Sequence, residues 1–243
     1  MNTAPQPLVS CLCVTESRPQ FSPWLWWSYT KQDYAGKELV IVDSSPEPLV
    51  CGEPDVRVIS ALTGTSVAAK RNMALRAARG SVVAWFDDDD WQHPRRLSIL
   101  VRALSSGATL AGATQGWFVE PVGRRALRYA SHDGVIFNGL AAPTATAAGA
   151  AFDELKRRAA DTSWVRRLAT QAGEVAVVPE LLSLWLCHRR NLSNPVGKYT
   201  FPDSLGTVRA LVGPTDWGET DDRLTELVRR LRDDKHESSL KVS

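Results

Sequence analysis

Four consecutive aspartates, residues 87–90, directly follow an apolar run in the segment VVAWFDDDDWQHP. Four adjacent like charges repel one another, whereas the flanking Trp85 and Trp91 favour burial. Carboxylates at the end of a buried strand can share a hard divalent cation, Mg²⁺ or Mn²⁺, which takes oxygen ligands and keeps waters or substrate phosphates. The run therefore predicts a cation site. The alternative is a solvated acidic turn that precedes a helix.

The direction of the four side chains depends on the backbone. If it stays extended, residues two apart point the same way, so Asp87 pairs with Asp89 and Asp88 with Asp90.

Polar side chains also follow two other apolar runs. LVSCLCVT (8–15) leads into Thr15 and Glu16, and ELVIVDSS (38–45) ends in Asp43 and two serines. In α/β sheets, ligands bind outside the carboxyl ends of the strands. We therefore expect these strand ends and the aspartate run to form one site.

The elements that position these residues alternate along the first hundred residues. The expected strands are 8–15, 38–45, 56–60 and 81–86. The expected helices are 22–32, with Ser22 as its N-cap, and a second within 63–80 that ends at Gly80. This alternation predicts an α/β fold whose mainly parallel, Rossmann-like central sheet carries helices on both faces.

The second half of the chain has a different pattern. Helices are expected at 94–107, 152–159 and 161–173, two strands around a turn at 121–123, and short strands in 174–188. Residues 219–234 form an amphipathic pattern typical of a docked helix, and 235–243 are expected to be a frayed tail. The small-residue segment 136–152 has no clear periodicity.

Composition sets broad limits on function. The 243-residue chain has a formal net charge of +2, so the whole molecule is not drawn strongly to nucleic acid or membrane. Its four cysteines lack the spacing of a zinc or redox site, which indicates reduced thiols. The N-terminus does not resemble a leader, and no apolar run of 18 residues occurs. We expect a soluble, cytoplasmic protein without a membrane span.

Four motifs carry a resemblance to a known family. LVSCLCVTESRP, ELVIVDSS, GTSVAAKRNMALRAARG and WFDDDDWQHPRRL, in this order, resemble the nucleotide-binding half of family 2 glycosyltransferases with the GT-A fold. The likeness is strong over 7–105 and looser over 106–195. It implies a nucleotide-sugar-binding half (1–105), a smaller acceptor-binding and catalytic-base half (106–200) and a C-terminal helix and tail (201–243) within one domain. Related bacterial and bacteriophage proteins show similar motifs.

The resemblance implies a nucleoside diphosphate sugar, usually a UDP-sugar, as donor. The residues it assigns to the donor are Thr15, Glu16, Asp43 and Ser45 at the base, Lys70, Arg71 and Asn72 at the diphosphate and sugar, and Asp87 near the ribose, with Asp88 as a further donor-binding residue. Asp89 is the implied ligand of Mn²⁺ or Mg²⁺. A cation with Lys70 or Arg71 would stabilise the departing diphosphate. Arg71 also falls on the apolar side of its helix, where it needs an anionic partner.

The acceptor half resembles the family in two shorter motifs. AADTSWVRRL matches the segment whose aspartate, here Asp161, deprotonates the acceptor hydroxyl, although Ala160 replaces the usual glutamate. The alternative for Asp161 is a helix cap. LWLCHRRNLSNP matches a segment near the metal and diphosphate. It implies His188 as a metal ligand and Asn191 and Ser193 as phosphate donors. The alternative for His188 is a structural histidine.

These inferences predict an inverting, metal-dependent glycosyltransferase that uses a carboxylate base. The acceptor is a saccharide, a small molecule or a hydroxymethylated base in DNA, for which VGRRALRY, LKRR, VRRL and CHRRN could provide a basic surface. An alternative of another class is a non-catalytic nucleotide-sugar-binding module. A nucleotidyltransferase is disfavoured, because VTESRPQFS lacks the glycines of a phosphate loop.

Overall fold

The described part of the chain is built on a seven-stranded sheet with the order β10-β6-β9-β4-β1-β2-β3. The computed structural model describes residues 6–131, 134–155, 160–188, 191 and 199–240, with the backbone alone for 232–240. The strands of this sheet are β1 (Val9–Thr15), β2 (Lys37–Asp43), β3 (Val56–Ser60), β4 (Val82–Trp85), β6 (Leu110–Ala113), β9 (Leu140–Pro143) and β10 (Val175–Val178). β3, β2, β1 and β4 are parallel, and β9 is antiparallel to both its neighbours. The predicted mainly parallel sheet is confirmed.

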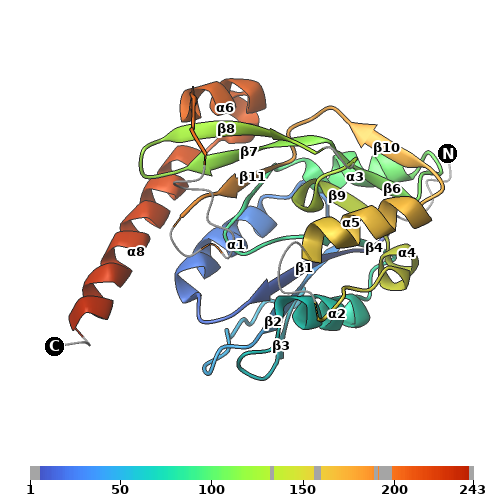
Figure 1. Cartoon of the computed structure of the whole chain (residues 1–243), viewed down its shortest axis with the longest axis horizontal. Coiled ribbons are helices and arrows are strands. Elements are labelled where there is room, and N and C mark those ends of the chain that lie inside the picture. Colours follow the sequence, from blue (N-terminus) through green and yellow to red (C-terminus); the bar gives the residue numbers. More distant parts are fainter. Residues whose placement is uncertain (1–5, 132–133, 156–159, 189–190, 192–198, 241–243) are drawn as a thin grey trace.

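Helices cover both faces of this sheet (Figure 1). Those on one face are α2 (Val67–Ala77), α4 (Thr144–Gly149) and α5 (Ala160–Gln171); those on the other are α1 (Ser22–Thr30) and α3 (Arg96–Leu104). Successive β1 residues alternate between the two layers: Cys11 and Cys13 join the α1 and α3 side, and Leu12 joins the α2 side. Because both faces are covered, the middles of the central strands are mainly apolar, as in residues 11–14 of β1 and 39–42 of β2.

A second, smaller sheet has the order β12-β8-β7-β11-β5. Its strands are β5 (Trp91–Gln92), β7 (Gln115–Glu120), β8 (Arg125–Ala130), β11 (Ser183–Leu186) and β12 (Asp203–Ser204). It packs against α6 (Leu205–Val212), α7 (Pro214–Trp217) and α8 (Thr220–Leu240) in a core that includes Trp91, Trp117 and Trp217. Figure 1 shows α8 beside this sheet, with its C-terminal part running away from it.

The aspartate run links the two sheets. β4 ends at Trp85 in the first sheet and β5 begins at Trp91 in the second, so the four aspartates cross between them. The fully buried Arg96 supports both ends of this link: it donates to the Trp85 carbonyl (2.7 Å) and to Gln92 Oε1 (2.6 Å), and it also reaches Leu140 O in β9 (3.2 Å). The link is therefore held by buried hydrogen bonds on both sides.

Several predicted elements have different boundaries. Ser22 is the first residue of α1 and not its N-cap, because the 3₁₀ turn η1 (Pro19–Phe21) leads into the helix and no side chain caps it. α8 continues to Leu240, through most of the expected tail.

The predicted helix at 152–159 is wrong over residues 152–155, which are irregular or turn, and its remainder lies outside the described residues. The small-residue segment 136–152 contains the 3₁₀ turn η2 (Phe137–Gly139), β9 and α4.

No helix in the described part of the chain combines the length and the apolarity needed to cross a bilayer.

Candidate active site

The carboxyl ends of β1, β2 and β4 meet at one edge of the main sheet. β1 pairs in parallel with β2 on one side and β4 on the other, and Thr15 lies directly opposite Asp43. The loops that leave these strands carry the polar residues singled out in the sequence. The expected convergence at a single sheet edge is therefore present.

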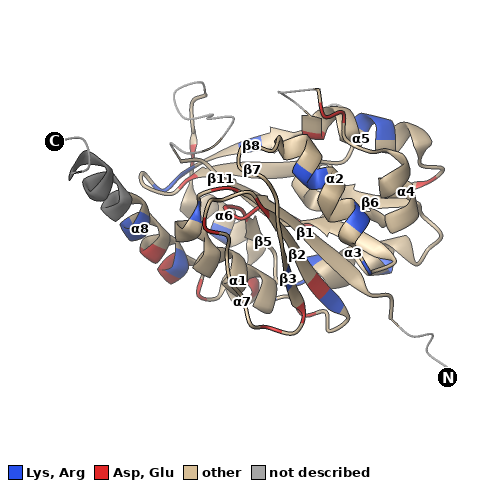
Figure 2. Cartoon of the chain, turned by 90° about the horizontal axis from the view of Figure 1, so that it is seen from below, with Lys and Arg blue, Asp and Glu red and all other residues tan. Residues whose placement is uncertain are grey.

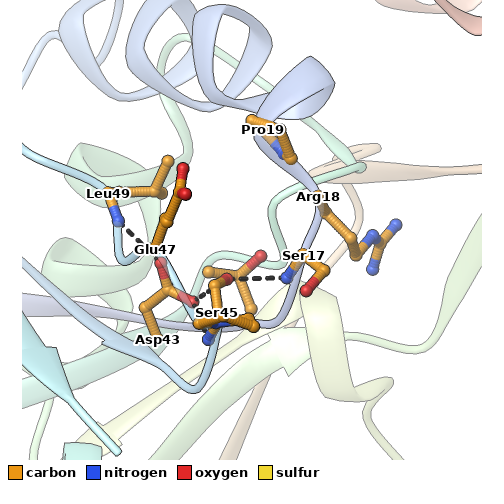
Figure 3. A pocket seen from close by; sticks show the side chains of 9 residues that line it. Ser17, Arg18, Pro19, Asp43, Ser45, Glu47 and Leu49 are labelled. Atoms are coloured by element: carbon orange, nitrogen blue, oxygen red, sulfur yellow. Dashed lines mark hydrogen bonds between the residues drawn. The ribbon is translucent and has the colours of Figure 1, made fainter. Parts of the chain in front are cut away.

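A pocket of about 340 Å³ lies beside the ends of β1 and β2 (Figure 3). It is lined by Thr15, Ser17, Arg18, Pro19, Asp43, Ser45, Pro46, Glu47 and Leu49. The buried Asp43 carboxylate accepts hydrogen bonds from the backbone N–H groups of Ser45 and Leu49, both at 2.8 Å, and from the Ser45 hydroxyl. Ser45 Oγ in turn accepts from Ser17 N (2.6 Å). Asp43 thus shapes the pocket wall through its neighbours.

Lys70 ties the strand ends together from α2. Lys70 is 2% exposed, and its ammonium donates to Thr15 O (3.0 Å), Ser44 Oγ (2.8 Å) and Glu16 Oε2 (3.2 Å). Burial raises the pKa of Glu16, but hydrogen bonds from the Gly64 N–H and from Lys70 outweigh it, so the pKa lies below its usual value. The structure thus brings together Thr15, Glu16 and Lys70, and it uses all three ammonium protons of Lys70 in doing so.

Arg71 and Asn72 point to different partners. The Arg71 guanidinium lies 3.7 Å from Asp87 and 4.2 Å from the centre of the Phe137 ring, so it has the anionic partner that its apolar position requires. The Asn72 amide donates to Phe152 O and Glu154 Oε1, both at 2.9 Å, and accepts from Phe152 N (2.7 Å). Asn72 therefore fastens α2 to the segment that precedes α5.

The backbone turns within the aspartate run. Residues 88–90 form a turn and a bend, and Asp90 N donates to Asp87 O at 3.4 Å. The pairing expected for an extended backbone is wrong, because the turn sends the side chains to three different places. Asp88 and Asp89 share Arg18 as a partner. Asp87 faces Arg71, and Asp90 faces the backbone N–H of Leu186.

Arg18 is the shared partner of Asp88 and Asp89. Its guanidinium lies 3.1 Å from Asp88 Oδ1 and makes an ion pair with Asp89 Oδ2. Asp88 also accepts a hydrogen bond from the Thr15 hydroxyl (2.6 Å). Burial raises the pKa of Asp88 to about 7 against the attraction of Arg18. A cation supplied by the chain itself therefore offsets part of the repulsion within the run.

The other partners of Asp89 come from the segment after β11. His188 Nε2 lies 3.0 Å, and Asn191 Nδ2 3.2 Å, from the same Oδ2 atom. Burial raises the pKa of Asp89, but the attraction of Arg18 and His188 outweighs it and lowers the pKa to about 2. The structure thus joins the predicted residues Asp89, His188 and Asn191. The predicted Ser193 lies outside the described residues.

Asp87 and Asp90 occupy contrasting positions. Asp87 is partly exposed, and burial together with Asp89 raises its pKa against the pull of Arg71. Asp90 is buried, accepts from Leu186 N (3.2 Å) and contacts Asn138; burial and the other aspartates raise its pKa well above its usual range. Asp90 therefore joins the run to β11, and Asp87 remains partly exposed.

Asp89 and His188 have the donor chemistry of a divalent metal site. Two adjacent ligands at about 2.1 Å from an octahedral ion are about 3.0 Å apart, and Asp89 Oδ2 and His188 Nε2 are separated by 3.0 Å. Within the described residues no group of three His, Cys, Asp or Glu side chains forms a complete ligand set. The residues present fit an ion that takes its other ligands from substrate oxygens and water.

Asp161 lies in the first turn of α5, close enough for its charge to raise the pKa of Asp87. Its Oδ1 accepts from Thr162 N at 2.8 Å, a contact local to the helix start. Trp164, one turn later, stacks on Phe152 and meets the edge of Trp85, the last residue of β4. This packing holds the start of α5 against the strand that leads into the aspartates.

The sequence prediction assigned no role to Arg18 or Asn138. Arg18 lies three residues beyond the end of β1, within the quoted motif, but its direction depends on Ser17, which has a positive φ of 51°. Such a backbone state in a residue other than glycine is not visible in residue types. Asn138 comes from η2, inside the segment without clear periodicity.

Comparisons with known proteins agree with this geometry. The family model described as glycosyl transferase family 2 matches residues 23–140. The chain is 32% identical over 103 residues to the "Putative colanic acid biosynthesis glycosyl transferase WcaA" of Escherichia coli (strain K12); this match covers 39% of the chain and 37% of that protein.

Solved structures share the fold. S. aureus TarS in complex with UDP-GlcNAc matches 84% of this chain and 65% of its own, with a TM-score of 0.60 and 16% identity. The mannosyltransferase PcManGT from Pyrobaculum calidifontis, in complex with GDP-Man and Mn²⁺, matches 77% of this chain and 59% of its own, with a TM-score of 0.57 and 15% identity. The matched region spans about a third of the length of WcaA and of the longer TarS structure, at 37% and 36%.

Proposed function

We propose that this chain, a member of glycosyltransferase family 2 with the GT-A fold, transfers a sugar from a nucleoside diphosphate sugar to an acceptor hydroxyl with inversion at the anomeric carbon. The observation that carries the proposal is the meeting of the aspartate run, His188 and the pocket at one sheet edge. This edge is where ligands bind in open α/β sheets.

The donor fits this edge from the pocket to the aspartates. The pocket between Asp43 and Pro19 takes the nucleoside, and Thr15, at the end of β1, lines the pocket and also bonds Asp88. The diphosphate then lies toward Asp89, and the sugar toward Asp87 and Arg71. TarS and PcManGT were solved with UDP-GlcNAc and GDP-Man, so both UDP- and GDP-sugars are candidates.

Asp89 and His188 would hold a divalent cation, Mn²⁺ or Mg²⁺, whose charge stabilises the leaving diphosphate. The PcManGT complex contains Mn²⁺, which supports this proposal. The chain's own residues orient this site: Asn191 holds the Asp89 carboxylate and Phe21 packs on the His188 ring at 4.7 Å. Both contacts restrict the two ligands before any ion arrives.

Asp161 is the proposed general base. Its charge acts on Asp87, which supports a position on the sugar side of the aspartate run. A carboxylate there can take the proton of an acceptor hydroxyl as the bond to the anomeric carbon forms. With Asp161 on one side of that carbon and the diphosphate leaving toward Asp89 on the other, the proposed transfer would invert its configuration.

We propose a saccharide or other small hydroxyl compound as the acceptor. A duplex DNA acceptor would need a basic surface and an extruded base. Arg125 and Arg209 pair with Glu120 and Asp221 (3.3 and 3.2 Å), and Figure 2 shows basic and acidic residues mixed along α8. These ion pairs and the mixed charges of α8 give no support to DNA over a saccharide, and the basic residues of LKRR and CHRRN lie outside the described residues.

The test is the release of nucleoside diphosphate from a panel of UDP- and GDP-sugars, with Mn²⁺ or with EDTA, first alone and then with saccharides and hydroxymethylated DNA. We expect one donor to be consumed only with metal, and consumption to vanish in Asp89→Ala. The exposed Asp222→Ala on α8 is the matched control. Binding of a donor without turnover under any acceptor would indicate a binding module, and no binding of any donor would refute the proposal.

A further inference from the structure

Arg18 occupies the junction between the two parts of the donor site. It lines the pocket beside Asp43 and, through its guanidinium, also holds Asp88 and Asp89. In Figure 3 its side chain points away from Asp43 and Ser45. A molecule extending from the pocket to Asp89 must pass this side chain.

The guanidinium of Arg18 still has unused hydrogen-bonding capacity. Its Nε is buried and has no hydrogen-bond partner within the described residues. The side chain is 20% exposed and rests on the Phe21 ring, 4.5 Å from its centre. A guanidinium presents five N–H donors in a fork that matches phosphate as well as carboxylate. Nη1 faces Asp88 and Nη2 faces Asp89, so within the described residues each of these atoms has a second N–H for a further oxygen acceptor.

Arg18 and a metal ion would compete for the same atom. Asp89 Oδ2, which faces His188 Nε2 at 3.0 Å, is also the oxygen paired with Arg18. Two cations cannot share this small, buried position without strong repulsion, because the protein interior screens charge poorly. Binding of the ion thus requires the guanidinium to leave Asp89.

We propose that Arg18 is an internal cation that exchanges partners: it neutralises Asp88 and Asp89 before ligands bind, and it moves from Asp89 to the diphosphate when the metal and the donor enter. The proposal rests on the function proposed above. The new acceptor is close at hand, because the pocket that Arg18 lines is also lined by Thr15, whose hydroxyl donates to Asp88.

The exchange predicts two effects of opposite sign in Arg18→Gln. Without nucleotide, Mn²⁺ should bind about tenfold more tightly, since its competitor is gone. With saturating Mn²⁺, UDP or GDP should bind about tenfold more weakly, since a forked phosphate contact is lost. A purely structural arginine would weaken both.

The experiment measures Mn²⁺ binding by electron paramagnetic resonance and nucleotide binding by calorimetry, on the full chain. Arg18→Lys is the second variant: it keeps the competing charge but not the fork, so only its nucleotide affinity should fall. Arg95→Gln is the control, because Arg95 pairs with Asp216 (2.6 Å) outside the site. Thermal unfolding establishes that each variant is folded.

Equal Mn²⁺ affinity in wild type and Arg18→Gln would overturn the exchange and leave the proposed glycosyltransferase function intact. Weaker binding of both ligands in folded Arg18→Gln and Arg18→Lys would overturn it in favour of a structural role. Absence of Mn²⁺ binding in every variant, even with nucleotide, would overturn the exchange together with the proposed metal site. Donor turnover in EDTA would then show whether the transferase function survives without metal.

Discussion

Two carboxylate sites at the same sheet edge differ in the groups that compensate their negative charge. Asp43, at the end of β2, is satisfied by two backbone N–H groups and the hydroxyl of its own loop. The aspartates after β4 are satisfied largely by side chains from distant segments, among them Arg18, Arg71 and His188. A backbone partner fixes a loop, whereas a side-chain cation can be exchanged. The comparison suggests a shaped pocket at β2 and an exchangeable charge site at β4.

The largest effect should follow from removing the charge at the centre of the exchangeable site. Asp89→Asn keeps the shape but loses the negative charge that attracts the ion, and it leaves Arg18 with Asp88 as its remaining carboxylate partner, so kcat should fall about 10³-fold. Steady-state release of nucleoside diphosphate measures this. Asp222→Asn should match wild type, and near-normal kcat in Asp89→Asn would show that the run is only structural.

The base on the other side of the sugar should matter almost as much. Asp161→Asn should lower the transfer rate about 10²-fold or more, because the amide cannot accept the proton, while donor affinity stays unchanged. Rapid-quench transfer and nucleotide calorimetry separate the two quantities. The exposed Asp153→Asn, on the segment before α5, is the control. A loss of donor affinity with a normal transfer rate would remove Asp161 from the base role.

A smaller effect is expected at the shaped pocket beside β2. In Asp43→Asn one of the two backbone N–H groups of Ser45 and Leu49 loses its charged acceptor, at a cost of about 1–3 kcal/mol. Nucleotide affinity should fall about tenfold, with kcat nearly unchanged at saturating donor. Glu53→Gln, an exposed position farther along the same loop and outside the pocket lining, controls for charge. If kcat fell as far as in Asp89→Asn, the distinction between the two sites would fail.

The smallest effect concerns a buried group outside both sites. His93 directly follows β5, and burial lowers its pKa despite the nearby Asp216. Below about pH 6.5 the unfolded chain binds a proton at this residue that the folded chain rejects, so stability falls as the pH drops, by at most about 1.4 kcal/mol per pH unit.

His93→Gln should remove this part of the pH dependence, as measured by denaturant unfolding at several values between pH 5 and 8. Glycosyl transfer should remain unaffected. A steeper loss of stability in the variant than in wild type at acid pH would contradict this, because it would mean that His93 stabilises the fold as the pH drops.

The sequence was informative where geometry follows from topology. Parallel neighbouring strands must end at the same edge, so Thr15, Asp43 and the aspartates were expected to meet, and they do. The apolar position of Arg71 correctly indicated an anionic partner, which is Asp87.

The rest depends on details that residue types do not carry. The turn at 88–90 decides that Asp88 and Asp89, rather than alternate aspartates, share a partner. The positive φ of Ser17 directs Arg18 to them. β6 and β9 are four-residue strands whose assignment comes from tertiary pairing and not from their own periodicity.

The most direct test of the central claim is a calorimetric titration of UDP and GDP into wild type and Asp89→Asn, each with Mn²⁺ and with EDTA. If the aspartate run is the metal and diphosphate site, Mn²⁺ will strengthen nucleotide binding at least about tenfold in wild type, and the gain will disappear in Asp89→Asn. Nucleotide binding to wild type that is the same with Mn²⁺ and with EDTA would contradict the claim.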